Sequence, residues 1–204
     1  MKNILCFGDS NTYGLKPDGT GRYDFSVRYT GVLQNILGSD YHIVEEGCPG
    51  RTTIFEDKIR PYKKGIDYIV PCVQSHTPLD YVVIMLGTND CKTAYKADAD
   101  KITTGLSEII NAVKNNTTAY IIIVSPIHLG DKIGTKGYDK EFDEKSIETS
   151  KKLAEKYKIL ASENDYGFID ASKVSVASEI DNEHLDELGH KKLGQKVADY
   201  IMSR

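Results

Sequence analysis

The sequence predicts an α/β fold in which a five-stranded parallel sheet carries helices on both faces. Five short apolar segments alternate with longer segments of helical periodicity along the whole chain. Two of the apolar segments, residues 80–86 and 119–125, are continuous and rich in β-branched side chains, which is typical of strands covered on both sides. No linker, repeat or low-complexity tract divides the 204 residues, so we expect one domain spanning residues 1–204.

The first half of the predicted sheet contains residues 3–7 and 41–45, both short apolar runs. Residues 29–37, which lie between these two strands, have the spacing of an amphipathic helix. A second helix is predicted over residues 66–76. Within it, Pro71 indicates a kink or a later start, because proline lacks the N–H group that a helix interior uses.

Three further helices and a short last strand complete the alternation. Residues 102–114 place five apolar side chains on one stripe. Residues 142–164 are long and highly charged, and their supportive i,i+4 pairs predict a solvated outer face. Residues 168–170 form the last strand and residues 185–201 the last helix. Strand–helix alternation implies a parallel sheet with right-handed crossovers. In such sheets ligands bind beyond the carboxyl ends of the strands, so we expect the functional residues there.

Charge and apolar patterning exclude several classes of function. The 26 basic and 30 acidic residues give a net charge of −4, which argues against a nucleic-acid partner and a polybasic membrane contact. No apolar run reaches the ~18 residues that span a bilayer, and the N-terminal run is too short for a signal peptide. The four cysteines form no CxxC pair, so we expect reduced thiols, a cytoplasmic location and no membrane partner.

Ser10 follows the first predicted strand, within a Gly-Asp-Ser-Asn-Thr segment. A hydroxyl at the tip of a strand-to-helix turn can be an exposed nucleophile, although Ser and Asp at such a turn also serve as helix N-caps. The same cluster could instead cradle the phosphate of a flavin through backbone N–H groups. The chain has neither a P-loop nor a G-x-S-x-G elbow.

Gly47 follows the second predicted strand and Asn89 the third. A glycine lets a backbone N–H approach a ligand without a Cβ in the way, but it is also an ordinary turn residue. A neutral amide can donate a hydrogen bond without adding charge, although Asn is equally common in turns and caps. Both residues are therefore candidate donors to a developing oxyanion.

Asp181 lies three residues before His184, just ahead of the last predicted helix. A carboxylate at that spacing can hold the Nδ1–H of an imidazole and leave Nε2 free as a base. His190 is six residues beyond His184, which is not the i,i+4 spacing of a helical metal pair, so we predict no metal site and no cofactor. Together with Ser10, the pair completes an acyl-transfer site with oxyanion donors from Ser10 N–H, Gly47 N–H and Asn89.

These segments resemble the SGNH (GDSL-like) hydrolases, and the intervening stretches resemble their small intracellular arylesterase/acyltransferase subgroup. The matching segments are Gly8-Asp9-Ser10, Gly47, Gly87-Thr88-Asn89-Asp90 and Asp181-x-x-His184. The resemblance implies a flavodoxin-like three-layer α/β/α sandwich and a Ser-His-Asp hydrolase of small acyl esters, including aryl and carbohydrate acetates. It further implies acyl transfer to alcohols in some members, and a homo-oligomer.

Four residues beside these segments depart from the subgroup's usual pattern: Asn11, Tyr13, Cys48 and Asn182, the last of which replaces a glycine. Asn11 and Cys48 are candidate substrate contacts for that reason. Arg51 could contact an acidic substrate group or form a surface ion pair. His128 is the rival base near a strand end. It lies in a glycine-rich segment, residues 127–139, that we expect to form a loop over the site.

Other functions remain compatible with the sequence. A lysophospholipase or a thioesterase would use the same triad. A flavodoxin-like FMN binder would share the fold and the first loop, but it would leave Asn89, Asp181 and His184 without a role. A non-catalytic module that binds esters or sugars would take up its ligand without turnover.

Overall fold

The computed structural model describes all of residues 1–204, and a single parallel sheet forms its centre. The strand order is β2-β1-β3-β4-β5, which is the doubly wound order of flavodoxin-like folds and confirms the predicted architecture. Every predicted strand is present, with bounds that shift by two residues at most. The strands are β1 (Lys2–Gly8), β2 (Tyr41–Gly47), β3 (Tyr81–Met85), β4 (Tyr120–Ser125) and β5 (Gly167–Asp170).

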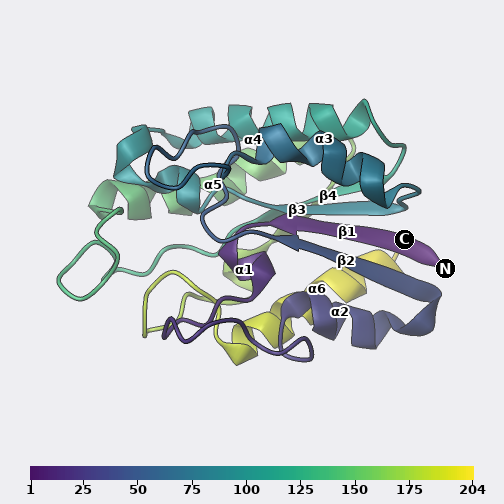
Figure 1. The fold of residues 1–204 in the computed structure, drawn as a ribbon, viewed down its shortest axis with the longest axis horizontal. Helices are drawn as coiled ribbons and strands as arrows, with labels where there is room; N and C mark the ends of the chain where they lie inside the picture. The colour runs from purple at the N-terminus through teal and green to yellow at the C-terminus, as the bar shows by residue number, and fades with distance from the viewer.

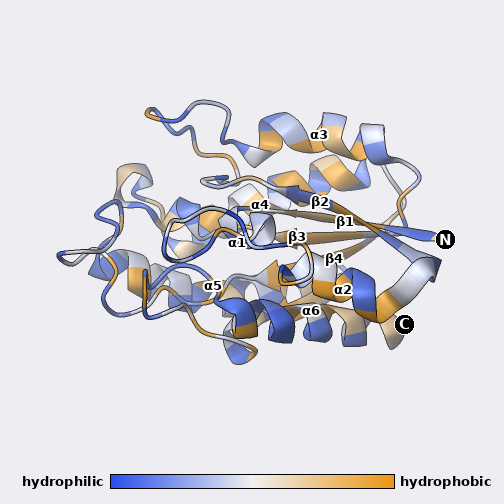
Figure 2. Cartoon of the chain, turned by 60° about the horizontal axis from the view of Figure 1, so that its bottom comes forward, coloured by the Kyte–Doolittle hydropathy of each residue, from blue (hydrophilic) through white to orange (hydrophobic).

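Five helices cover the two faces of the sheet (Figure 1). One face carries α3 (Gly65–His76), α4 (Ala99–Lys114) and α5 (Glu144–Glu163), and the other carries α2 (Tyr29–Leu37) and α6 (Glu187–Met202). Each face has its own cluster of buried apolar side chains. Figure 2 shows the same pattern by hydropathy: the central strands are mostly hydrophobic, the start of β1 and part of β2 are hydrophilic, and the helices are hydrophobic on one side.

Aspartate caps determine where three helices begin, and these starts differ by two or three residues from those that periodicity predicts. The side chain of Asp98 accepts a hydrogen bond from the N–H of Lys101, so α4 begins three residues before its predicted start. Asp143 forms a capping box with Ser146 at the start of α5. Asp186 caps α6, which leaves Leu185 outside the helix although the apolar spacing placed it inside.

The predicted helix over residues 66–76 is present as α3, which begins at Gly65 and runs through Pro71, so of the two effects expected from Pro71 the later start is wrong. Proline deprives the carbonyl four residues earlier of its partner. That carbonyl belongs to Asp67, and both Asp67 and Pro71 lie on the exposed side of the helix, where water can take the missing bond. The buried side, which carries Ile69 and Cys72, keeps its contacts with the core.

Three strands end side by side at the edge of the sheet that carries the long loops. Gly8 of β1 pairs with Gly47 of β2 and with Met85 of β3. The short helix α1 (Ser10–Tyr13) leaves this edge directly after β1, at the end of the molecule opposite the two termini (Figure 1). The segments that follow β1, β2 and β3 are thereby brought together.

All four cysteines are unpaired, and Cys48 alone among them is not buried. None of the helices combines the length and the apolar character that crossing a membrane requires.

Candidate active site

Ser10 is the first residue of α1, and the turn that presents it depends on its two neighbours. The Asp9 carboxylate accepts the N–H of Asn11 at 3.0 Å and caps the short helix. Gly8 cannot carry a side chain, since a Cβ there would stand 2.0 Å from the Thr12 Oγ1 atom. Burial raises the pKa of Asp9 to about 6. Ser10 itself is only 3% exposed, so its hydroxyl faces a confined space.

His184 connects Ser10 to Asp181 through two short hydrogen bonds. The Nε2 atom of His184 lies 2.8 Å from Ser10 Oγ, and its Nδ1 atom lies 2.6 Å from Asp181 Oδ2. Because the carboxylate can only accept, Nδ1 carries the proton and Nε2 is left to accept the serine proton. The second oxygen of Asp181 accepts the N–H groups of Glu183 and His184, each at 3.0 Å, which fixes the turn that carries the imidazole.

The charges around His184 favour its protonated form. Burial by itself lowers the pKa of His184, but the hydrogen bond to Asp181 and the charge of Glu183 outweigh it, so the pKa is raised. Burial also acts to raise the pKa of Asp181, and there the interactions with His184 prevail and lower it. Asp181 therefore stays ionised, and its charge can stabilise a protonated His184.

Glu183 is a buried carboxylate that sequence reasoning missed. Its Oε1 atom lies 4.0 Å from His184 Nε2, the atom that faces the serine. Burial raises its pKa to about 7. The available signal was its position between Asp181 and His184, a turn whose side chains were expected to face the site.

Asn11 and Asn182 hold the turn that carries His184. Asn11 is buried, and its side-chain oxygen accepts the N–H of Leu185 at 2.8 Å. This hydrogen bond helps to position the neighbouring His184. Asn182 adopts a left-handed φ of 61°, which explains how it stands in a glycine's place. Its side-chain oxygen accepts the N–H of Lys132 at 3.1 Å, which ties the predicted loop, residues 127–139, to the same turn.

Gly47 and Asn89 lie at the ends of the neighbouring strands, as predicted. A Cβ on Gly47 would stand 2.1 Å from the backbone nitrogen of Tyr13, so the glycine is needed for the close approach of α1. The buried side chain of Asn89 donates one amide hydrogen to the Arg51 carbonyl at 3.3 Å. An amide nitrogen has two hydrogens, which leaves the second for a ligand.

Arg51 is buried and forms no ion pair, which corrects the expectation of a surface ion pair. It is 5% exposed, and its guanidinium lies 4.1 Å from the centre of the Phe7 ring. Its Nη1 group donates to the carbonyls of Gly8 and Glu46, the former at 2.8 Å. The Nη1 group of Arg51 therefore joins the carboxyl ends of β1 and β2.

The two remaining candidates have different positions. Cys48 directly follows Gly47 and is half-buried. Its sulfur accepts a hydrogen bond from Lys63 Nζ at 3.5 Å. His128 lines a groove of about 1060 Å³ beside α5 and α6, together with Phe168 and several lysines. None of Ser10, Asp181 and His184 lines that groove, so the structure does not bring His128 to them. Burial lowers the pKa of His128.

Comparison with known proteins places this geometry in a family. The sequence model of the GDSL-like lipase/acylhydrolase family matches residues 6–192. Among solved structures, the aryl esterase of M. smegmatis is 33% identical, with a TM-score of 0.94 over 100% of this chain and 99% of that one. A carbohydrate acetylesterase family member from Sinorhizobium meliloti is also 33% identical, with a TM-score of 0.93 over 100% and 98% of the two chains.

A second carbohydrate acetylesterase from Sinorhizobium meliloti is 30% identical, with a TM-score of 0.93 over 100% of this chain and 99% of that one. No match is found among the curated proteins. The family match covers most of the chain, and the structural likeness extends over all of it. The chain therefore belongs to the GDSL-like lipase/acylhydrolase family and, as a member, is a carboxylic ester hydrolase.

Proposed function

We propose that this chain hydrolyses small acyl esters, acetyl esters foremost, with Ser10 as nucleophile, His184 as general base and Asp181 as the residue that orients it. The observation that carries the proposal is the continuous chain of hydrogen bonds from Asp181 through His184 to Ser10, at 2.6 and 2.8 Å. A serine hydroxyl is a weak nucleophile until a base takes its proton, and this arrangement supplies the base.

In the proposed reaction, Ser10 Oγ attacks the ester carbonyl while its proton moves to His184 Nε2. The oxyanion accepts hydrogen bonds from the N–H groups of Ser10 and Gly47 and from the free amide hydrogen of Asn89. The imidazolium returns the proton to the departing alcohol, and an acyl-enzyme remains on Ser10. Water, deprotonated by the same Nε2 atom, then attacks the acyl carbon and releases the acid.

Two observations support a small acyl group. Ser10 and His184 are 3% and 7% exposed, so a bulky acyl chain would have to displace the surrounding loops. The similar solved structures are named an aryl esterase and carbohydrate acetylesterases, which act on aryl esters and on acetylated carbohydrates. A lysophospholipase function would require a long apolar channel at Ser10.

Acyl transfer to an alcohol belongs to the same proposal. The acyl-enzyme reacts with any hydroxyl compound that can give its proton to His184 Nε2. The alcohol then takes the place of the attacking water beside Nε2, because its one hydroxyl hydrogen is the proton that His184 accepts. The ratio of ester to acid formed in buffer that contains a primary alcohol measures this activity.

We also propose a homo-oligomer in the cytoplasm. Its support is the apolar surface at Ile59 and Tyr62, which are 78% and 94% exposed on one loop. Sedimentation velocity of the full chain tests it, and a single monomer boundary at micromolar concentration would reject it.

A fluorophosphonate probe, read by intact mass and peptide mapping, tests the nucleophile. We expect one adduct per chain, on Ser10, which is absent in Ser10→Ala and unchanged in Ser26→Ala, where the altered serine is exposed. A series of p-nitrophenyl esters from acetyl to decanoyl then tests the substrate. An adduct elsewhere would refute the assignment, and faster turnover of the long esters would favour a lipase.

A further inference from the structure

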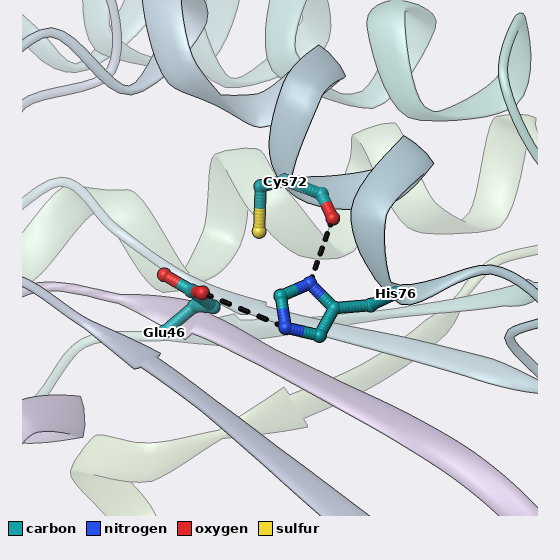
Figure 3. Close-up of side chains that lie close together, drawn as sticks. All are labelled: Glu46, Cys72 and His76. Carbon is teal, nitrogen blue, oxygen red and sulfur yellow. Dashed lines mark hydrogen bonds and ion pairs between the residues drawn. The ribbon is translucent and has the colours of Figure 1, made fainter.

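A second group of chemically reactive side chains lies between the edge strand β2 and helix α3. It consists of Glu46, Cys72 and His76, whose ligand atoms all lie within 4.8 Å of one another (Figure 3). None of the three takes part in the proposed ester hydrolysis. Figure 3 shows the Cys72 thiol and the His76 ring directed toward the Glu46 carboxylate.

Local periodicity explains why these side chains face each other. Cys72 and His76 are four residues apart on α3 and therefore project from the same side of the helix, the side that also carries Ile69 and Val73. On β2, successive side chains alternate between the two faces of the sheet. Glu46 shares a face with Val44, which packs against the core beneath α3.

The orientation of the His76 ring is fixed by hydrogen bonds on the side away from Glu46. Its Nδ1 atom lies 2.9 Å from the Cys72 carbonyl, which can only accept, so Nδ1 carries a proton. The Nε2 atom then points at Glu46 Oε1, 3.9 Å away. The Nε2 lone pair and the carboxylate therefore face the same space, where one metal ion could bind both. A backbone carbonyl on the distal nitrogen is also the usual support of a metal-bound histidine.

We propose that Glu46, Cys72 and His76 form a binding site for a thiophilic divalent metal ion, with Zn²⁺ as its preferred occupant and water as the fourth ligand. One thiolate, one imidazole and one carboxylate match the ligands that zinc takes, whereas Mg²⁺ and Ca²⁺ require oxygen ligands. Bond lengths of about 2.0 to 2.3 Å place the ligand atoms of a tetrahedral zinc roughly 3.3 to 3.6 Å apart. The ligand atoms now lie within 4.8 Å of one another, and side-chain rotations that move them by about 1 Å would bring them to that distance.

The environment of Cys72 determines how the metal ion would bind. Burial, assisted by the Glu46 charge, raises the pKa of Cys72 to about 12, and the charge of Arg51 opposes that rise. The thiol is thus protonated at neutral pH, and binding proceeds as thiol plus Zn²⁺ giving zinc thiolate plus one released proton. The Glu46 and His76 side chains are partly exposed and give the ion a path from solvent. Tyr68 Oη lies 3.4 Å from Glu46 Oε1 and supports the carboxylate from the other side.

Titration of the chelator-treated, reduced protein with Co²⁺ tests the proposal, because a cobalt thiolate absorbs in the near ultraviolet and tetrahedral cobalt in the visible. We expect saturation at one Co²⁺ per chain and displacement of the spectrum by Zn²⁺. Cys72→Ser should abolish the charge-transfer band. His76→Gln and Glu46→Gln, which alter partly exposed side chains, should each weaken binding at least about tenfold.

Cys48→Ser is the matched control, because Cys48 is the one thiol that is not buried, and it should leave the cobalt spectrum unchanged. As a second readout, Zn²⁺ should raise the Tm of the wild-type chain and not that of His76→Gln, since an ion bound only to the folded state stabilises it. The proposal is overturned if no saturable band forms, if the band follows Cys48 instead of Cys72, or if His76→Gln keeps the wild-type affinity.

Discussion

Replacing Glu183 by Gln should move the acid limb of the pH–rate profile to lower pH. The substitution keeps the size of the buried side chain and removes a negative charge 4.0 Å from His184 Nε2. That charge contributes to the raised pKa of His184. His184 must be neutral to accept the Ser10 proton, so activity is lost as the pH falls through its pKa. A lower pKa therefore preserves activity further into the acid range.

The distance sets the size of the effect. Two unit charges 4 Å apart interact by about 1 kcal/mol in water and by about 4 kcal/mol at an effective dielectric constant of 20. At about 1.36 kcal/mol per pKa unit, these limits correspond to shifts of ~0.7 and ~3 units. Because burial raises the pKa of Glu183 to about 7, the two groups titrate as a pair. The wild-type limb should therefore extend over two protonation steps, and that of the variant over one.

The assay is kcat/KM for p-nitrophenyl acetate between about pH 5 and pH 9, which reports on the free enzyme, read at the isosbestic wavelength of the product. Glu179→Gln is the matched control, because it removes an exposed carboxylate four residues earlier and should leave the limb in place. A Glu183→Gln limb within about 0.3 units of the wild-type limb, or above it, would refute the assigned coupling to His184.

Three further predictions concern the site and the fold. Asn89→Ala should lower kcat by about 10²–10³ because one oxyanion donor is lost, with the acyl-donor KM little changed; full activity in steady-state assays would remove Asn89 from the oxyanion hole. Ser10→Ala or His184→Ala should lower kcat on the order of 10⁶ while circular dichroism stays that of the wild type, and substantial residual turnover would exclude either residue as a member of the triad. Asp143→Ala removes the capping box of α5 and should lower the free energy of unfolding by about 1 kcal/mol in urea titrations. Glu144→Ala, at an exposed position in the first turn, is its control. An equal loss of stability in both variants would contradict the capping role of Asp143.

The strands and most of the helices could be predicted because their signals are local. A continuous apolar run such as residues 119–125 has few alternatives to a strand covered on both sides. The helix starts at Ala99 and Glu187 were less predictable, since an aspartate side chain decides them and aspartate is equally common in loops. The later start suggested by Pro71 was wrong for a related reason. The effect of this proline on α3 depends on which side of the helix faces water, which the packing of the helix determines.

The residue types of the candidate active site could also be named from the sequence, because strand ends in a parallel sheet converge, three motifs lie at such ends, and the fourth precedes the last helix. Ser10, Asp181 and His184 do lie in hydrogen-bond contact, and their catalytic roles stay a prediction for the labelling experiment. Arg51 and Glu183 could not be assigned in this way. Whether a charged side chain is buried depends on segments far away in the chain, as the contact of Arg51 with the Phe7 ring shows.

The sequence by itself therefore determined the α/β class, the family and the identity of the candidate nucleophile and base, because these depend on short motifs and on periodicity. The tertiary structure alone decided which side chains meet across elements. The i,i+4 spacing of Cys72 and His76 was present in the sequence, but Glu46 joins them only because β2 pairs with β1 in one register and α3 packs over that face. A shift of one residue in that register would turn the Glu46 side chain to the opposite face of the sheet.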